Sequence, residues 1–280
     1  MKKATMLGLV AILMTLMLAA CGSNNGSSNT AATNNAGTSE ESTAAATNSL
    51  EKIKAAGKIV IGTEGTYPPF TYHDASGELT GFDVEIAREV AKRLGVEAQF
   101  EEAPWDSLLA GIEAKRFDAV FNEVAIRDDR KEKYDFSDAY ISSGAVLIVR
   151  EDNTDIKSLA DLKGKKSAQS LSSNLADIAR ENGAEIVAIE GFQQAIDLLN
   201  SSRADATIND NLSFLDLKKQ KPDLALKVVA EAEDASQSGA VFVKNSPELV
   251  EAVNKALADM HSDGTYATIS EKYFGEDVSK

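Results

Sequence analysis

Two segments of the chain combine residues that could recognise the charged groups of a small molecule. Ser172, Ser173 and Asn174 precede a helical pattern over 175–181, and a helix start offers free N–H groups and a favourable dipole to an anion. Asp210 follows a strand pattern over 204–208, at the strand end where open α/β sheets bind ligands. Both segments also have a simpler interpretation, because Ser, Asn and Asp are common N-caps of helices.

Several other chemistries lack the residues that they need. The chain has two histidines (His73 and His261) and one cysteine (Cys21), too few for a typical zinc site or an internal disulfide. Nucleotide-binding and hydrolase signatures of the types GxxxxGK[ST], GxGxxG and GxSxG are absent. A net charge of −15 argues against binding to nucleic acid. We therefore expect no metal or cofactor, although the many carboxylates leave a glycosidase-like acid/base pair open.

The N-terminus has the pattern of an export signal. Lys2 and Lys3 precede an uncharged apolar run over 6–20, which is too short to span a bilayer. The run ends in Leu-Ala-Ala before Cys21 and resembles a bacterial lipobox. This resemblance implies a signal peptide over 1–20 and a lipid anchor on Cys21 at the extracytoplasmic face of the cell membrane. The alternative is an ordinary signal peptide with a chance cysteine. Residues 22–49 are small or polar and predict a disordered linker.

The body from residue 50 to 280 alternates between strand and helix patterns. An apolar stripe at Phe82, Ile86, Val90 and Leu94 predicts a helix that Gly95 ends. Similar openings at 50–59 and 159–166 suggest two lobes of related plan. This alternation predicts an α/β fold with mostly parallel sheets. The expected strands are 58–62, 118–122, 145–149, 185–189, 204–208, 224–229 and 240–243.

Four segments of the body carry a family resemblance. They are 62–70 (GTEGTYPPF), 79–87 (LTGFDVEIA), 117–140, which contains FDAV and RKEKYDFSDAY, and 263–275, which contains DGT and KYFG. Together they resemble the family 3 solute-binding proteins, the polar amino acid receptors of ABC importers. Segments 63–74 (TEGTYPPFTYHD) and 167–174 (SAQSLSSN) are similar to the cystine-binding lipoproteins of Gram-positive bacteria within that family.

The resemblance implies a fold and a mode of action. We expect a type II periplasmic-binding-protein-like fold with two α/β lobes joined by a two-stranded hinge. Lobe 1 would comprise 50–142 and 244–280, and lobe 2 would comprise 143–243, with crossings near 143–149 and 238–243. A monomer would close on an amino acid, with cystine favoured, and deliver it to a permease served by ATPase subunits.

The resemblance also implies roles for single residues. Arg130 would grip the ligand's carboxylate, helped by N–H groups and a hydroxyl from Ser172, Ser173 and Asn174. Asp210 would pair with the ammonium, and the backbone around Asn122, Glu123 and Ala125 would complete its shell. Ala125 departs from many relatives, which carry Ser or Thr there. Composition alone gives the alternative that Arg130, within the charged run 128–133, is a solvated surface charge.

The far end of the site would set specificity. Its expected walls are Tyr67, Phe70, Trp105 and Phe121, with Glu64 and Asn122 as polar anchors. Phe70 and Phe121 have the alternative of belonging to the core.

Three other functions remain open alternatives. The ligand could be cysteine or another polar amino acid. The chain could be a secreted dehydratase or lyase using Glu64 or Glu123 as acid/base, although we expect no enzyme. It could also serve as a surface adhesin or a sensor.

Overall fold

The computed structural model describes residues 48–232 and 236–279. The expected signal peptide, Cys21 and most of the expected linker lie outside these residues. Within the described ranges, no helix is both long and apolar enough to cross a bilayer.

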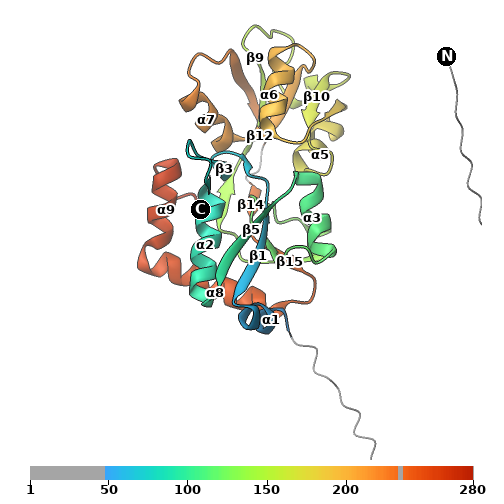
Figure 1. Cartoon of the computed structure of the whole chain (residues 1–280). Helices are drawn as coiled ribbons and strands as arrows, with labels where there is room; N and C mark the ends of the chain where they lie inside the picture. Colours follow the sequence, from blue (N-terminus) through green and yellow to red (C-terminus); the bar gives the residue numbers. More distant parts are fainter. Residues whose placement is uncertain (1–47, 233–235, 280) are drawn as a thin grey trace, which may run out of the picture. The chain divides into compact units, whose positions relative to one another are not determined.

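The first lobe is built on a five-stranded sheet (Figure 1). From edge to edge its strands are β5 (Glu97–Glu102), β1 (Lys58–Thr63), β6 (Ala119–Val120), β15 (Val241–Val243) and β7 (Tyr134–Phe136). Alternate side chains of β1 serve opposite faces, as the pleat of a strand requires. Ile59 and Ile61 join the core cluster under the C-terminal helices, whereas Val60 packs on the cluster of the other face.

Helices cover both faces of this sheet. On the face of Ile59 lie α1 (Ser49–Ala56), α2 (Phe82–Leu94), α8 (Pro247–Asp263) and α9 (Thr265–Phe274), and on the other lies α3 (Trp105–Glu113). Helix α2 forms as predicted, with Phe82, Ile86 and Val90 buried and Gly95 as a left-handed C-cap. The short α4 (Asp128–Lys131) carries Arg130.

The second lobe repeats the plan with another five-stranded sheet (Figure 1). Its order is β11 (Glu185–Ala188), β10 (Lys166–Gln169), β12 (Ala206–Asp210), β9 (Ala145–Arg150) and β13 (Leu226–Glu231). Leu147 and Val149 of β9 face the cluster that includes α5 (Asn174–Glu181), while Val146 and Ile148 face the opposite cluster. That opposite cluster includes α6 (Phe192–Asn200) and α7 (Asn211–Gln220), and a short 3₁₀ helix spans Leu159–Leu162.

A two-stranded antiparallel ribbon joins the lobes. It pairs β8 (Ile141–Ser143) with β14 (Ser236–Ser238), and the chain leaves it into β9 on one side and β15 on the other. Two α/β lobes joined by a two-stranded hinge are therefore confirmed. Four of the five strands in each sheet run in the same direction, as expected of mostly parallel sheets, and the exceptions are β9 and β15, which run antiparallel to both of their neighbours. These are the strands that leave the hinge, and their direction is set by the crossing.

A small three-stranded sheet brings a loop to the gap between the lobes. It consists of β2 (Thr66–Tyr67), β3 (Thr71–His73) and β4 (Leu79–Thr80). The backbone N–H groups of Phe82 and Asp83 donate to the carbonyls of Pro69 and Phe70, which fixes this loop on the start of α2.

The Phe70 carbonyl can come this close to the start of α2 because residue 81 is a glycine. A larger residue at this position should therefore destabilise the protein. The φ of Gly81 is 127°, and a Cβ there would lie 2.2 Å from the carbonyl oxygen of Phe70. We expect Gly81→Ala to destabilise the protein by roughly 2–5 kcal/mol and to lower its Tm by about 5–15 °C in a calorimetric scan. Gly77→Ala is the matched control, because Gly77 also has a positive φ, 83°, but faces open space. Equal losses in the two variants would contradict the steric explanation.

Candidate functional site

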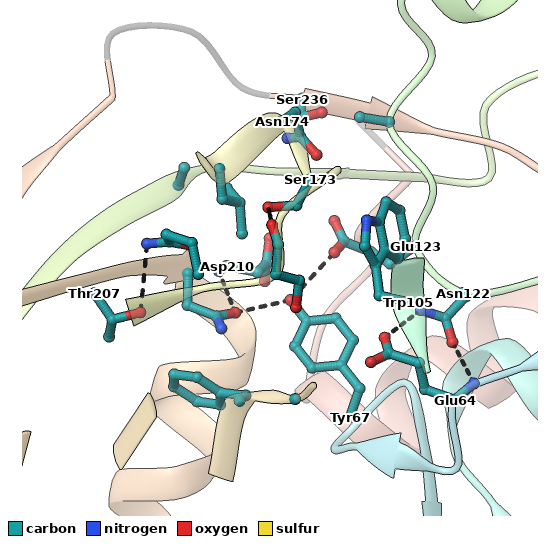
Figure 2. A pocket seen from close by; sticks show the side chains of 18 of the residues that line it. Glu64, Tyr67, Trp105, Asn122, Glu123, Ser173, Asn174, Thr207, Asp210 and Ser236 are labelled. Carbon is teal, nitrogen blue, oxygen red and sulfur yellow. Dashed lines mark hydrogen bonds between the residues drawn. The ribbon is translucent and has the colours of Figure 1, made fainter. Parts of the chain in front are cut away.

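A cavity lies between the two lobes and receives side chains from both (Figure 2). Glu64, Tyr67, Trp105, Asn122, Glu123 and Ala125 come from the first lobe, and Ser143 and Ser236 come from the hinge. The second lobe supplies Ala145, Gln169, Ser170, Ser173, Asn174, Leu175, Ile189, Gly191, Phe192, Thr207, Asn209 and Asp210. The lining is thus partly apolar and partly rich in hydrogen-bonding groups.

Glu64 and Asn122 form one polar corner of this cavity (Figure 2). The Asn122 amide donates to the Glu64 carboxylate at 2.7 Å and accepts the Glu64 N–H at 2.8 Å. Burial raises the pKa of the Glu64 carboxyl to about 7, although the Asn122 hydrogen bond opposes the rise. Glu64 can therefore hold or release a proton near neutral pH.

A second polar cluster gathers at the hinge around Glu123 and Asp210 (Figure 2). Asp210 caps α7 by accepting the N–H of Leu212 at 2.8 Å, and its other carboxyl oxygen accepts from the Ser143 hydroxyl. The same hydroxyl lies 3.3 Å from Glu123 Oε1. Burial raises the pKa of Asp210 to about 6, and burial together with the Asp210 charge raises that of Glu123 well above its usual range.

Arg130 is a buried cation behind the cavity wall. Its side chain is 5% exposed, and its guanidinium donates to the Ala125 carbonyl at 3.0 Å. The guanidinium also lies 5.4 Å from the centre of the Trp105 ring. Burial lowers its pKa to about 10, which still leaves it charged at neutral pH. Among the ion pairs of the described residues, none involves Arg130.

Aromatic residues divide between the cavity and the core. Trp105 and Tyr67 line the cavity, and the indole N–H of Trp105 is buried without a hydrogen-bond partner. Phe70 lies instead in the core against Tyr67, with ring centres 5.1 Å apart, and Phe121 stacks on Tyr140. The structure therefore places Phe70 and Phe121 behind the cavity lining, which corresponds to their alternative reading as core residues.

Ser173 and Asn174 bring the start of α5 to the cavity. The Ser173 hydroxyl accepts the N–H of Ala176 at 3.0 Å and caps the helix. Ser172 does not line the cavity. Its N–H and hydroxyl donate to the Asp106 carboxylate of the first lobe at 2.9 and 2.6 Å, and the Leu171 N–H donates there at 3.2 Å.

Further hydrogen bonds tie the lobes together. The Tyr67 hydroxyl donates to Asn209 at 2.8 Å, and Arg127 forms an ion pair with Asp177 at 2.9 Å. The structure is thus a closed arrangement of the lobes.

Nine of the thirteen expected site residues line this cavity, and the four others are Phe70, Phe121, Arg130 and Ser172. The sequence reasoning missed the polar groups of Ser143, Gln169, Thr207 and Asn209. Gln169, Thr207 and Asn209 lie in the last few residues of β10 and β12, so the position of strand ends was the signal that could have found them. Within the described residues, no group of His, Cys, Asp or Glu is suited to hold a metal ion.

Comparison with known proteins supports the resemblance found in the sequence. Residues 59–276 match the bacterial extracellular solute-binding proteins, family 3. The L-cystine-binding protein TcyA of Bacillus subtilis is 45% identical over 281 residues, covering all of both chains.

Two solved structures bear on the conformation. An ancestral arginine-binding protein bound to glutamine, 38% identical, superposes with a TM-score of 0.75 over 79% of this chain and 99% of its own. The L-cystine solute receptor of Neisseria gonorrhoeae in its unliganded open conformation is 43% identical, but its TM-score is 0.55 over 83% of this chain and 99% of its own. The more similar sequence gives the poorer superposition, as expected when one structure is closed and the other open. The chain belongs to the bacterial extracellular solute-binding proteins of family 3, with their type II two-lobed fold.

Proposed function

We propose that the chain is the receptor of an ABC importer for a free amino acid, and that the amino acid is L-cystine. The observation that carries this proposal is the buried guanidinium of Arg130, which has no ion-pair partner and lies behind Trp105 in the wall of a cavity whose hinge side holds the carboxyls of Asp210 and Glu123. An amino acid zwitterion brings a carboxylate for the guanidinium and an ammonium for the carboxyls. Burying a charge is costly unless it is paired and hydrogen-bonded, so this arrangement favours a ligand with both charges.

The carboxylate of the ligand would be held by Arg130 and by the start of α5. A guanidinium can bond two carboxylate oxygens with parallel N–H groups. From the opposite lobe, Asn174 adds an N–H group without a hydrogen-bond partner in the described structure, and the start of α5 adds its dipole. A carboxylate between these groups would therefore link the two lobes and favour the closed form.

The ammonium of the ligand would be held by Asp210, with Glu123 beside it. Asp210 already accepts bonds from Ser143 and Leu212, which fix its side chain before the ligand arrives. The backbone of Asn122 and Ala125 would complete the ammonium shell, as the family resemblance suggests.

The choice of cystine rests on the far end of the cavity and on the full-length similarity to TcyA. Trp105, Tyr67 and Phe192 offer apolar faces, and a sulfur next to an aromatic ring gains about 0.3–1.5 kcal/mol. The free indole N–H of Trp105 can donate to a ligand oxygen. Glu64 and Asn122 then face the second amino acid half of cystine, whose ammonium would keep Glu64 ionised.

The setting of the receptor is also part of the proposal. Cys21 would anchor the chain by lipid to the outer face of the cell membrane after cleavage behind residue 20. The expected lobe boundary at 243 moves to about 240, because β15 (Val241–Val243) belongs to the sheet of the first lobe. The first lobe would then comprise 50–142 and 241–280 and the second 143–240, and the closed monomer would be recognised by a permease with its ATPase subunits. We further propose that the ligand is bound and released without chemical change.

Calorimetric titration tests this function. The protein is unfolded and refolded to remove any carried ligand, then titrated with L-cystine and with the other amino acids, and the recovered ligand is checked by mass spectrometry. Tight one-to-one binding of unchanged cystine is expected. Tight binding of a different amino acid would overturn the cystine assignment, and no binding of any amino acid would overturn the receptor function.

Asp106 gives a prediction about ligand release. Its carboxylate receives three hydrogen bonds from Leu171 and Ser172 across the mouth of the site, and bonds at an exposed charged group are together worth about 1–2 kcal/mol. We expect Asp106→Ala to speed cystine release by roughly 5- to 30-fold with an unchanged association rate, because the ligand enters the open form. Stopped-flow fluorescence can follow this through Trp105, the only tryptophan of the chain. Asp128→Ala is the control, since that side chain is fully exposed. An unchanged release rate in Asp106→Ala would contradict the role of this contact.

A further inference from the structure

Around Glu123 and Asp210 at the hinge, the oxygen atoms that can accept hydrogen bonds outnumber the protons that neighbouring groups can donate. The Ser143 hydroxyl has one proton, yet it contacts both Asp210 and Glu123, and the Asp210 contact is the shorter. Ser238 likewise lies nearer to the backbone carbonyl of Glu123, at 3.2 Å, than to its carboxyl, at 3.5 Å. Neither hydroxyl is therefore free to donate to the Glu123 carboxyl.

The Tyr67 hydroxyl does not donate a proton to the Glu123 carboxyl either. The Asn209 side-chain oxygen accepts the N–H of Asp210 at 2.7 Å, which identifies that atom as an acceptor. The Tyr67 hydroxyl, 2.8 Å from the same oxygen, must therefore donate its proton there. Its remaining contact, to Glu123 Oε2 at 3.4 Å, then joins two oxygens and is favourable only if Glu123 carries a proton.

The surrounding charges favour the same protonation. Glu123 faces the carboxyls of Asp210 at the start of α7 and Asp83 at the start of α2, and the cation of Arg130 on α4. The neutral partners are Tyr67, Ser143 and Ser238. Two adjacent carboxylates in a dry site do not both ionise readily, and burial and the Asp210 and Asp83 charges raise the pKa of Glu123.

We propose that Glu123 and Asp210 together hold one proton in the ligand-free protein, and that the ammonium of the incoming amino acid displaces it to solvent. The inference rests on the proposed function, because it takes the ammonium to lie at Asp210. The net charge of the pair and its cation is −1 before and after: one proton leaves, and one ammonium arrives. Ligand affinity should then fall by up to about tenfold for each unit of pH decrease below the point where the pair becomes fully ionised.

Calorimetry in buffers of different ionisation enthalpy tests the exchange. L-cystine is titrated at pH 6.5, where its ammonium groups are protonated, in phosphate, imidazole and Tris-type buffers. The slope of binding enthalpy against buffer ionisation enthalpy gives the protons released. Glu64, which the second ammonium of cystine would ionise, contributes to the release equally in both proteins. We therefore expect the native protein to release about one proton more than Glu123→Gln, whose amide cannot carry the exchanged proton.

The variant Glu64→Gln distinguishes proton release by Glu64 from proton release by the Glu123 and Asp210 pair. Glu64 also lines the cavity, and burial raises its pKa to about 7. The released proton should persist in Glu64→Gln. Tight binding with the same proton release from the native protein and from Glu123→Gln would overturn the exchange at Glu123 and Asp210 while leaving the receptor function intact. Absence of binding to any amino acid would overturn the receptor function itself.

Discussion

Replacing Arg130 by methionine should lower the affinity for cystine by roughly 150- to 4,000-fold without unfolding the ligand-free protein. Removing one partner of a buried charge pair costs about 3–5 kcal/mol, which corresponds to that range of Kd. In the ligand-free protein, however, Arg130 has a carbonyl and an aromatic ring but no carboxylate as partner. An apolar side chain of similar length removes an uncompensated charge, so we expect the Tm to stay within a few degrees. Calorimetric titration and thermal scans measure the two effects separately.

Arg116→Met is the matched control. Arg116 also lies over an aromatic ring, 5.1 Å from the centre of Phe117, but its side chain is 53% exposed and it contributes nothing to the cavity lining. It should bind cystine as the native protein does. If Arg130→Met retained native affinity, the carboxylate site would be elsewhere. If it unfolded, Arg130 would be a structural residue.

The second large effect is expected for Asp210→Asn. The substitution removes the charge that would pair with the ammonium, while the amide oxygen can still cap α7 through the N–H of Leu212. Truncating one partner of a buried charge pair costs about 2–4 kcal/mol, so Kd should rise by roughly 30- to 900-fold. The expected loss is smaller than for Arg130 because Glu123 remains beside the ammonium.

The stability of this variant should depend on pH in a defined direction. Burial raises the pKa of Asp210 from 3.8 to about 6, so the folded protein binds more protons than the unfolded chain between these values. The stabilising contribution of this group is full below about pH 4 and is lost as the pH rises to about 6. Asp210→Asn should therefore gain stability relative to the native protein over that interval, as measured by urea unfolding.

Asp205→Asn is the control for Asp210→Asn. Asp205 lies just before the other end of β12 and accepts the N–H of Lys166, away from the cavity. It should leave cystine affinity unchanged. Comparable losses of affinity in both variants would show that Asp210 acts through the fold of β12 and not through a charge.

The helices of the fold could be predicted well from the sequence, because their apolar stripes repeat with the helix period. Helix α2 has its predicted stripe and its glycine C-cap. Strand β5, with the sequence EAQFEE, could not be found in this way. It is an edge strand whose residues are half-buried or exposed, and only its pairing with β1 defines it. Strand direction also leaves no periodic signal, so the antiparallel courses of β9 and β15 became visible only in the sheets.

The candidate site was predictable where a residue's role follows from its position on one element. Asp210 at a strand end and Ser173 at a helix start are such residues, and both line the cavity. The role of Ser172 depends on the opposite lobe, where Asp106 takes its hydrogen bonds. The proton deficit around Glu123 depends on groups from the first lobe, the second lobe and the hinge together. Such relations join groups on separate elements of the fold, and no local pattern in the sequence records them.

A crystal structure of the refolded protein with L-cystine tests the central claim most directly. We expect one α-carboxylate within hydrogen-bond distance of the Arg130 guanidinium and of the Asn174 N–H at the start of α5. The ammonium on the same carbon should lie within hydrogen-bond distance of Asp210. A ligand that lies in the reverse orientation, or that is enclosed by the lobes without touching Arg130, would contradict the account.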